Sequence, residues 1–218
     1  MCRFLVLRSS REFDPYPILD TFKERCRRSS EYQGHGFGVA FRTSGGWERR
    51  RSLTPLWEDQ APIPGGVDAL MVHARSAFRN EGIDVENNMP FYRDELGFVF
   101  NGEIRGIRLR APGRIGAEKL FHLILARRRN GLSQALGDAD RIVHSRSRYV
   151  RAMNVALTTL GNLNGDPAIY AHCRFSERPD YFTLYCAEGR EGEPRGVSSE
   201  PLDESFRPME NGETRVLR

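Results

Sequence analysis

The sequence predicts an α+β protein, and three observations support this fold class. Residues 15–28 and 116–129 carry apolar side chains at helical spacing. The last third of the chain has short alternating runs separated by turn signals such as Asn211-Gly212, which is typical of an antiparallel sheet built from hairpins. The 218 residues show no linker, repeat or low-complexity tract. We therefore expect one domain, residues 1–218, in which helices pack against sheets.

The first half of the chain alternates strand patterns with a single helix. The helix follows Asp14-Pro15, a cap and first-turn signal, and its apolar face is Ile18, Leu19, Phe22 and Cys26. A glycine-rich bend, Gly34 to Gly38, leads into the second strand. The predicted strands are residues 1–7, 39–41, 47–53, 67–74 and 96–100, and the last two are apolar enough to be buried on both faces.

The second half begins with helices and ends with strands. The helix at 116–129 is amphipathic, and a weaker helix pattern occupies residues 133–151. Turn signals include Asn162-Leu163-Asn164-Gly165-Asp166 and Glu188-Gly189. The predicted strands between the turns are residues 155–160, 168–175, 181–187, 196–199 and 214–217.

The composition argues against nucleic-acid-binding, membrane-spanning and disulfide-rich proteins. The net charge of +4 is carried almost wholly by arginine, but 29 acidic residues are interspersed and no aromatic residues interleave with the basic clusters, which argues against nucleic-acid binding. No apolar run is long enough for a membrane helix or a signal peptide, so we expect a cytoplasmic protein. Four scattered cysteines predict core thiols, with Cys173 and Cys186 on neighbouring strands, rather than a disulfide framework. No metal site or cofactor motif is recognisable.

The second residue, Cys2, suggests a catalytic nucleophile. Methionine aminopeptidases remove a Met that precedes a small residue, and this would leave a thiol and a free α-amine on one residue. The two groups have pKa values near ~8.5 and ~8, so the amine can accept the thiol proton through one water. The alternative is that Cys2 is a small apolar residue in the first strand.

Two strand ends supply groups that fit this chemistry. Arg75 follows the strand at 67–74 and offers a planar fork for a substrate carboxylate, although a structural ion pair is an equal interpretation. Asn101 and Gly102 follow the strand at 96–100, where the Asn101 side-chain N–H and the Gly102 backbone N–H could stabilise an oxyanion. Asn-Gly by itself more often marks a hairpin turn. The combination with Cys2 favours a hydrolytic site.

These residues resemble the class II glutamine amidotransferases, which are N-terminal nucleophile hydrolases, and in particular their small stand-alone branch. The similarity extends over nearly the whole chain. Its motifs are Met1-Cys2-Arg3, Gly36-Phe37-Gly38-Val39, Pro55-Leu56-Trp57, Ala74-Arg75-Ser76-Ala77, Asn87 with Pro90-Phe91, Asn101-Gly102-Glu103-Ile104 and Ser198-Ser199-Glu200-Pro201-Leu202.

The resemblance implies a four-layer αββα sandwich and hydrolysis of a γ-glutamyl carboxamide. Cys2 would attack, its amine would be the general base, and water would cleave a glutamyl thioester after ammonia leaves. Arg75 and Ser76 would bind the substrate. Because residues 1–218 hold no second domain, we expect acceptor chemistry either to belong to a synthetase or acceptor-domain partner protein or to be absent.

The chain departs from the family pattern where an aspartate normally binds the substrate α-amine. It reads Ile115-Gly116-Ala117-Glu118 there, so Glu118 or Glu103 would have to substitute. His35, Met89 and Phe100 also replace polar family residues. Three interpretations follow: an amidohydrolase acting on glutamine or another γ-glutamyl amide, an inactive relative that binds a ligand or partner subunit, and an N-terminal cysteine hydrolase for a different acyl amide.

Overall fold

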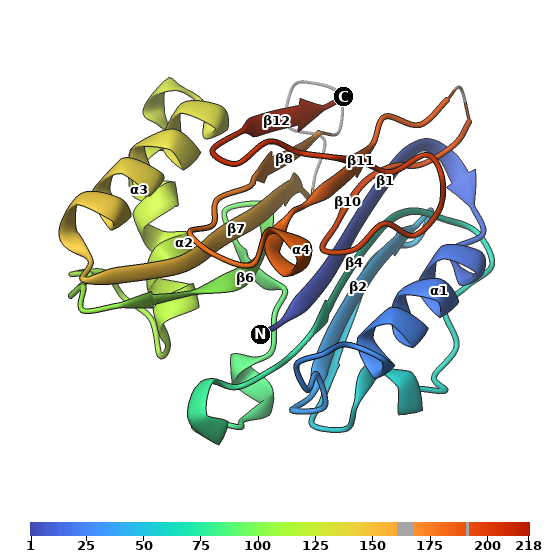
Figure 1. Cartoon of the computed structure of the whole chain (residues 1–218). Coiled ribbons are helices and arrows are strands. Elements are labelled where there is room, and N and C mark those ends of the chain that lie inside the picture. The colour runs from blue at the N-terminus through green and yellow to red at the C-terminus, as the bar shows by residue number, and fades with distance from the viewer. Residues whose placement is uncertain (161–167, 191) are drawn as a thin grey trace.

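Two antiparallel sheets lie face to face between helical layers in the computed structural model, which describes residues 1–160, 168–190 and 192–218 (Figure 1). Helix α1 (Tyr16–Arg27) covers the outer face of the first sheet. Helices α2 (Gly116–Arg127) and α3 (Leu132–Arg146) cover the outer face of the second. The expected αββα sandwich is confirmed.

The first sheet has seven strands in the order β11-β9-β10-β1-β4-β2-β3. Strand β1 lies at its centre and pairs with β4 and β10 on its two sides. The strands are β1 (Arg3–Phe13), β2 (Phe37–Thr43), β3 (Gly46–Ser52), β4 (Val67–Ala74), β9 (Tyr185–Ala187), β10 (Arg195–Ser198) and β11 (Arg207–Pro208).

The second sheet has five strands in the order β12-β8-β7-β6-β5. They are β5 (Phe91–Arg93), β6 (Leu96–Arg105), β7 (Tyr149–Thr159), β8 (Ile169–His172) and β12 (Thr214–Leu217). A short helix, α4 (Pro179–Phe182), lies near the N-terminus of the chain (Figure 1). Single 3₁₀ turns occupy residues 56–58, 78–80, 85–87 and 128–130.

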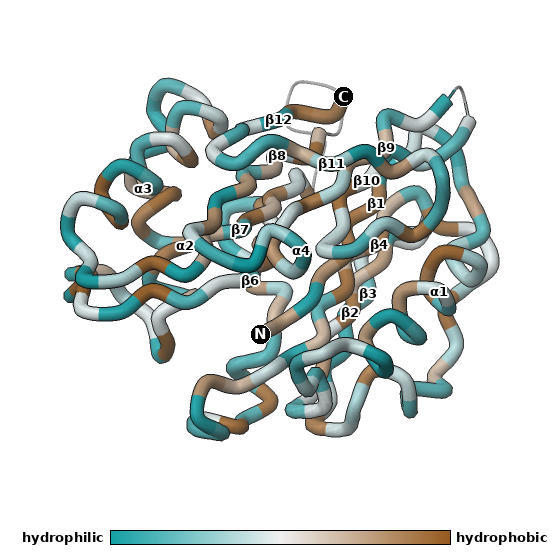
Figure 2. The backbone as a smooth tube through the Cα atoms, viewed as in Figure 1, coloured by the Kyte–Doolittle hydropathy of each residue, from teal (hydrophilic) through white to brown (hydrophobic). Residues whose placement is uncertain are grey.

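Alternation along β1 divides the core into two layers. Phe4 and Val6 point into the space between the sheets, whereas Leu5 and Leu7 pack against α1. On the far side of the second sheet, Phe98 stacks on Phe121 of α2 with ring centroids 4.7 Å apart. Apolar segments follow the central strands, while the outer helices alternate apolar with polar residues (Figure 2). Each sheet is therefore buried on both faces.

The structure corrects several boundaries. Asn101, Gly102 and Glu103 lie within β6 rather than after its end, because the partner strand β7 begins at Tyr149 and pairs with β6 as far as Arg105. The strand β7 thus includes residues assigned to a weak helix. Residues 181 and 182 lie in α4, which starts at Pro179, and not in a strand.

The two thiols expected on neighbouring strands, Cys173 and Cys186, are associated with different sheets. Cys173 follows β8 of the second sheet and Cys186 lies in β9 of the first, so they are not on neighbouring strands. Both are buried, and neither forms a disulfide, as expected for core thiols. The turn predicted at 162–166 falls outside the described residues. None of the helices in the described part of the chain has the length and apolar character needed to cross a bilayer.

Two glycines give a matched test of the packing. A Cβ on Gly38 of β2 would lie 2.1 Å from the Met89 carbonyl oxygen, whereas a Cβ on Gly137 of α3 would meet nothing within 4 Å. We expect Gly38→Ala to lower the free energy of unfolding by about 2 kcal/mol or more through overpacking. Gly137→Ala should raise it by about 0.5–1 kcal/mol through helix propensity. Denaturant unfolding measures both, and equal stabilities would contradict the packing at Gly38.

Candidate active site

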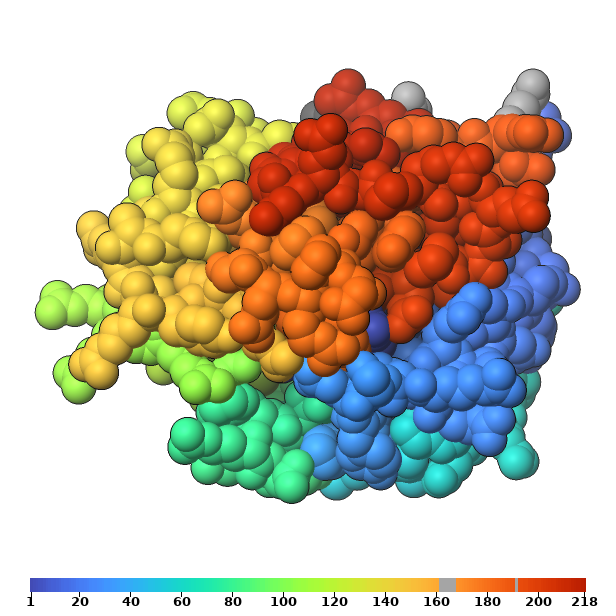
Figure 3. Space-filling model, viewed as in Figure 1, coloured from blue at the N-terminus to red at the C-terminus, as the bar shows by residue number. Residues whose placement is uncertain are grey.

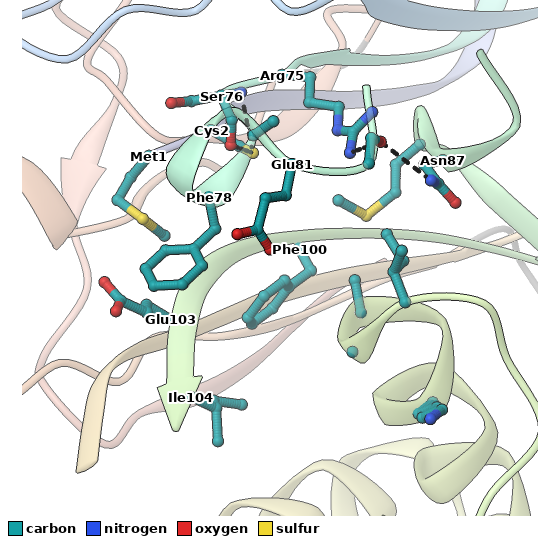
Figure 4. A pocket seen from close by; sticks show the side chains of 18 of the residues that line it. Met1, Cys2, Arg75, Ser76, Phe78, Glu81, Asn87, Phe100, Glu103 and Ile104 are labelled. Atoms are coloured by element: carbon teal, nitrogen blue, oxygen red, sulfur yellow. Dashed lines mark hydrogen bonds between the residues drawn. The ribbon is translucent and has the colours of Figure 1, made fainter. Parts of the chain in front are cut away.

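Five of the predicted site residues line one cavity of about 810 Å³ at the end of the sandwich that holds the N-terminus. They are Cys2, Arg75, Ser76, Gly102 and Glu103. Figure 4 shows Cys2, Ser76 and Arg75 on one side of this cavity, and Phe100, Glu103 and Ile104 from β6 on the other. The cavity therefore opens between the two sheets.

Strand register places Cys2 beside Arg75. Strands β1 and β4 are antiparallel with Arg3 opposite Ala74, so residues 2 and 75 are the next facing positions. Beyond the strand ends, the Ser76 N–H donates to Cys2 Sγ over 3.3 Å, and the thiol donates to the Ser76 carbonyl over 3.5 Å. Ser76 thus orients the sulfur with its backbone.

His35, in the bend that precedes β2, holds residues 75–77 in place. The Ala77 N–H donates to His35 Nδ1 over 2.8 Å, and the Arg75 N–H donates to the Gly36 carbonyl over 2.8 Å. Partial burial and the nearby charge of Arg75 lower the pKa of His35. The ring is neutral at physiological pH and remains a hydrogen-bond acceptor.

Burial raises the pKa of the Cys2 thiol, although the charges of the Met1 α-amine and Arg75 and the Ser76 N–H act in the opposite direction. The thiol is consequently protonated at neutral pH. A nucleophilic role would require a base to remove this proton.

Polar side chains from three segments surround the Met1–Cys2 peptide. The Met1 α-amine pairs with Glu31, whose other oxygen accepts from Arg151 over 3.0 Å. Partial burial opposes ionisation of Glu31, but these cations outweigh it and lower its pKa. The Met1 carbonyl accepts from Tyr181 Oη over 2.7 Å and from Gln33 Nε2. Figure 3 shows only a small dark blue surface of the first residues between their neighbours.

The Arg75 guanidinium is bound by neutral oxygens. It donates to the carbonyls of Gly82 over 2.6 Å and Asp84 over 3.2 Å, and to Asn88 Oδ1 over 3.3 Å. Within the described residues it forms no ion pair, so the structural ion pair considered from sequence is not present there. The guanidinium lines the cavity, and the charge of Asp84 acts on it without a direct ion pair. An anionic ligand group would form that direct ion pair.

Of the two residues expected to bind an oxyanion, Gly102 lines the cavity and Asn101 does not. Gly102 faces Met153 of β7, whose N–H donates away from β6 to the Arg174 carbonyl over 2.7 Å. Paired residues of an antiparallel ladder bond mutually or not at all, so the Gly102 N–H also points away from β7. A Cβ at Gly102 would lie 2.1 Å from the Ala152 carbonyl oxygen, which only glycine avoids.

Asn101 is fully buried, and neither polar atom of its side chain has a partner among the described residues. It does not line the cavity. The buried His73 of β4 lies behind it, with Nε2 3.3 Å from the Phe100 carbonyl oxygen and Nδ1 unpartnered. Two buried polar side chains with spare hydrogen-bonding capacity therefore lie close to the Cys2 end of the cavity.

The two glutamates named as substitutes for the missing aspartate are already engaged. Glu103 pairs with Arg105 and lies 3.9 Å from Arg151. Glu118 accepts from the Arg114 N–H over 2.7 Å and lies outside the cavity wall. Gly116 lines the cavity and contributes no side chain, and a Cβ there would have open space around it.

Sequence patterns did not identify several residues around the site. Gln33, Glu31 and Tyr181 surround the N-terminus from distant segments, so no local signal indicates them. His73 could have been found, since it lies in β4 two residues before Arg75, and alternation directs it between the sheets on the same face as Met71.

Solved structures share this fold over 99% of the chain. A glutamine aminotransferase class-II domain protein from Silicibacter pomeroyi is 16% identical with a TM-score of 0.61, and 94% of that chain is covered. A predicted glutamine amidotransferase from Pseudomonas aeruginosa is 15% identical with a TM-score of 0.61 and 97% coverage. The glutamine phosphoribosylpyrophosphate amidotransferase from B. subtilis is 14% identical with a TM-score of 0.65, but only 47% of its length is covered.

No protein-family model matches the sequence, and no curated protein matches it either. The structural likeness nevertheless confirms the resemblance stated from the motifs at the level of the fold. The chain has the fold of the class II glutamine amidotransferase domains, which is the N-terminal nucleophile hydrolase type.

His73 provides a test of the buried layer beneath the site. Burial and the charge of Arg75 lower the pKa of His73 to about 3. In the unfolded chain the pKa is near ~6.5, so the folded state is favoured above that pH and loses stability as the pH falls toward 3. Between pH 7 and pH 4.5 this group should cost about 2–3 kcal/mol of unfolding free energy. His73→Gln should remove that part of the pH dependence in denaturant unfolding. An unchanged slope would show that His73 is not buried as a neutral ring.

Proposed function

We propose that this protein hydrolyses a γ-glutamyl-type carboxamide through a thioester on Cys2 and releases ammonia or an amine. The supporting observation is that Cys2 Sγ and the Arg75 guanidinium, which forms no ion pair among the described residues, lie at the ends of the adjacent strands β1 and β4 and line one cavity. Arg75 would bind the α-carboxylate and so bring the distal carboxamide to the sulfur. The fold similarity supports glutamine amide chemistry in general, and a cytoplasmic location remains a prediction.

The reaction would proceed in two steps. After Met1 is removed, the Cys2 amine takes the thiol proton, and sulfur attacks the amide carbon. The Gly102 N–H stabilises the oxyanion, and the leaving nitrogen departs with the proton. The Asn101 side-chain N–H would be a second donor only after the side chain turns from its buried position toward the cavity. Water then attacks the thioester, the amine accepts its proton, and the acid is released with the thiol restored.

The side chains around the N-terminus are suited to orient the Cys2 α-amine as the general base. In the mature chain, Gln33 and Tyr181 would lose the Met1 carbonyl as a partner and would face the Cys2 amine. Gln33 is fully buried, and its Oε1 has no partner in the described structure. An acceptor at this point would orient the amine toward the thiol.

The cavity supports substrates larger than glutamine. A volume of about 810 Å³ is in the range that holds drug-sized ligands. Its far wall combines apolar side chains, such as Ile104 and Ile107, with the cations Arg105, Arg108 and Lys119. An amide whose leaving amine carries apolar and anionic groups fits this wall. Where free ammonia is the product, we propose a synthetase or acceptor domain as its recipient.

A ligand-binding or partner subunit without activity is the second candidate. The observation that favours it is the set of contacts made by Met1, since both its amine and its carbonyl have buried or half-buried partners. A retained Met1 would keep the Cys2 nitrogen in a peptide bond and remove the base.

Intact mass tests the nucleophile directly. We expect purified protein to lack Met1 and to gain one adduct on exposure to a thiol-alkylating glutamine analogue. Cys2→Ser should gain none, and its amide cleavage should fall at least about a hundredfold because a hydroxyl is a poorer nucleophile at neutral pH. Loss of Met1 without an adduct would point to another amide. Retained Met1, or full activity in Cys2→Ser, would contradict the mechanism.

Steady-state kinetics test whether Arg75 binds the substrate carboxylate. Arg75→Lys keeps the charge but loses the fork, so KM for a carboxylate-bearing amide should rise about tenfold with a smaller change in kcat. The matched comparison is a substrate in which that carboxylate is amidated, for which wild type and variant should be alike. Equal kinetics on the acidic substrate would show that Arg75 serves only to hold the loop at residues 82–88.

A further inference from the structure

The loop that binds Arg75 also presents an unpaired carboxylate to the cavity. Glu81 lines the cavity and is exposed, and no hydrogen bond or ion pair engages its side chain within the described residues. Figure 4 shows its carboxylate extending from the loop toward Phe100, in the space below Cys2. Arg79 and Asn80 have φ of 52° and 57°, and this left-handed turn directs the chain back over the cavity.

The position of Glu81 depends on Arg75, because the residue after Glu81 is hydrogen-bonded to the guanidinium. The next residue, Gly82, accepts a 2.6 Å hydrogen bond from Arg75 Nη2, and Asp84 accepts another over 3.2 Å. These two hydrogen bonds hold residues 82–84 against the guanidinium, and with them the backbone of Glu81. The side chain of Glu81 has three rotatable bonds, and no described residue pairs with it, so its carboxylate can adjust to a ligand held by Arg75.

An α-amino acid head group has a carboxylate and an ammonium on the same carbon. A site that holds both needs a cation and an anion a few ångströms apart. We propose that Glu81 binds the α-ammonium of the substrate whose α-carboxylate is bound by Arg75. This inference rests on the proposed glutamyl specificity, and makes Glu81 a specificity-determining residue of the same site.

The other groups of the cavity do not offer this function. Glu103, which is the other acidic residue among the described lining residues, is paired with Arg105. Glu118 is held by Arg114 outside the wall. Arg108 and Lys119 would repel an ammonium, which favours its binding at Glu81.

Binding to Cys2→Ala protein tests the inference without turnover. The probes are two pairs: L-glutamine with glutaramate, and γ-L-glutamylanilide with glutaranilic acid. The second member of each pair lacks only the α-amine. We expect calorimetry to show about tenfold tighter binding of at least one amine-bearing compound than of its partner, the size expected for one partly solvated charged hydrogen bond.

Glu81→Gln in the same background should remove this preference and leave the affinity for the compound without the amine unchanged. Glu81→Asp keeps the negative charge and should retain part of the preference for the amine-bearing compound. Glu86→Gln is the matched control, because Glu86 is on the same loop but pairs with Arg114 over 2.8 Å and does not line the cavity. It should leave the preference intact.

The inference is wrong if Glu81→Gln weakens both members of a pair equally, changes neither, or if no compound is preferred in the parent protein. Failure of the proposed hydrolysis is separate. It would appear as an intact amine preference in the Cys2→Ala protein together with no cleavage of either amine-bearing compound by protein that retains Cys2. Absence of binding to all four compounds would overturn both.

Discussion

The pairing of β1 with β4 is the constraint on which the site depends. With Arg3 opposite Ala74, the chain must bring residue 2 next to residue 75 at the end of the first sheet. A one-residue slip would turn the side chains of β1 to the opposite face. That slip would also transfer Phe4 and Val6 from the inter-sheet core to the α1 side. The hydrophobic pattern of β1 and the position of its thiol are therefore specified together.

The second sheet completes the cavity through a strand that continues past its apolar run. Strand β6 extends to Arg105 because β7 pairs with it along its whole length. Asn101, Gly102 and Glu103 are consequently held by a ladder rather than by a turn. A rigid strand positions backbone donors more accurately than a loop does, and this favours the proposed oxyanion-binding role of the Gly102 N–H.

Two charged side chains at the cavity, Arg75 and Glu81, form no ion pair among the described residues. Arg75 is solvated by carbonyl oxygens, and Glu81 has no partner on the same loop. Elsewhere at this end, cations are neutralised, as with Arg151 between Glu31 and Glu177. Arg75 and Glu81 form no ion pair among the described residues and are brought together by one loop, so they indicate where a ligand with a cation and an anion would bind.

The amino-acid pattern alone determined the fold class, the apolar faces of the first helix and of α2, and the motifs of Cys2, Arg75 and Asn101-Gly102, since these depend on local periodicity and residue chemistry. The extents of β6 and β7 depended on their mutual pairing, and α4 depended on its packing near the N-terminus. The tertiary structure alone decided that Glu118 lies outside the cavity wall and that Glu81 faces the cavity. Side chains from separate segments meet only when the sheets stack, and no local pattern records that meeting.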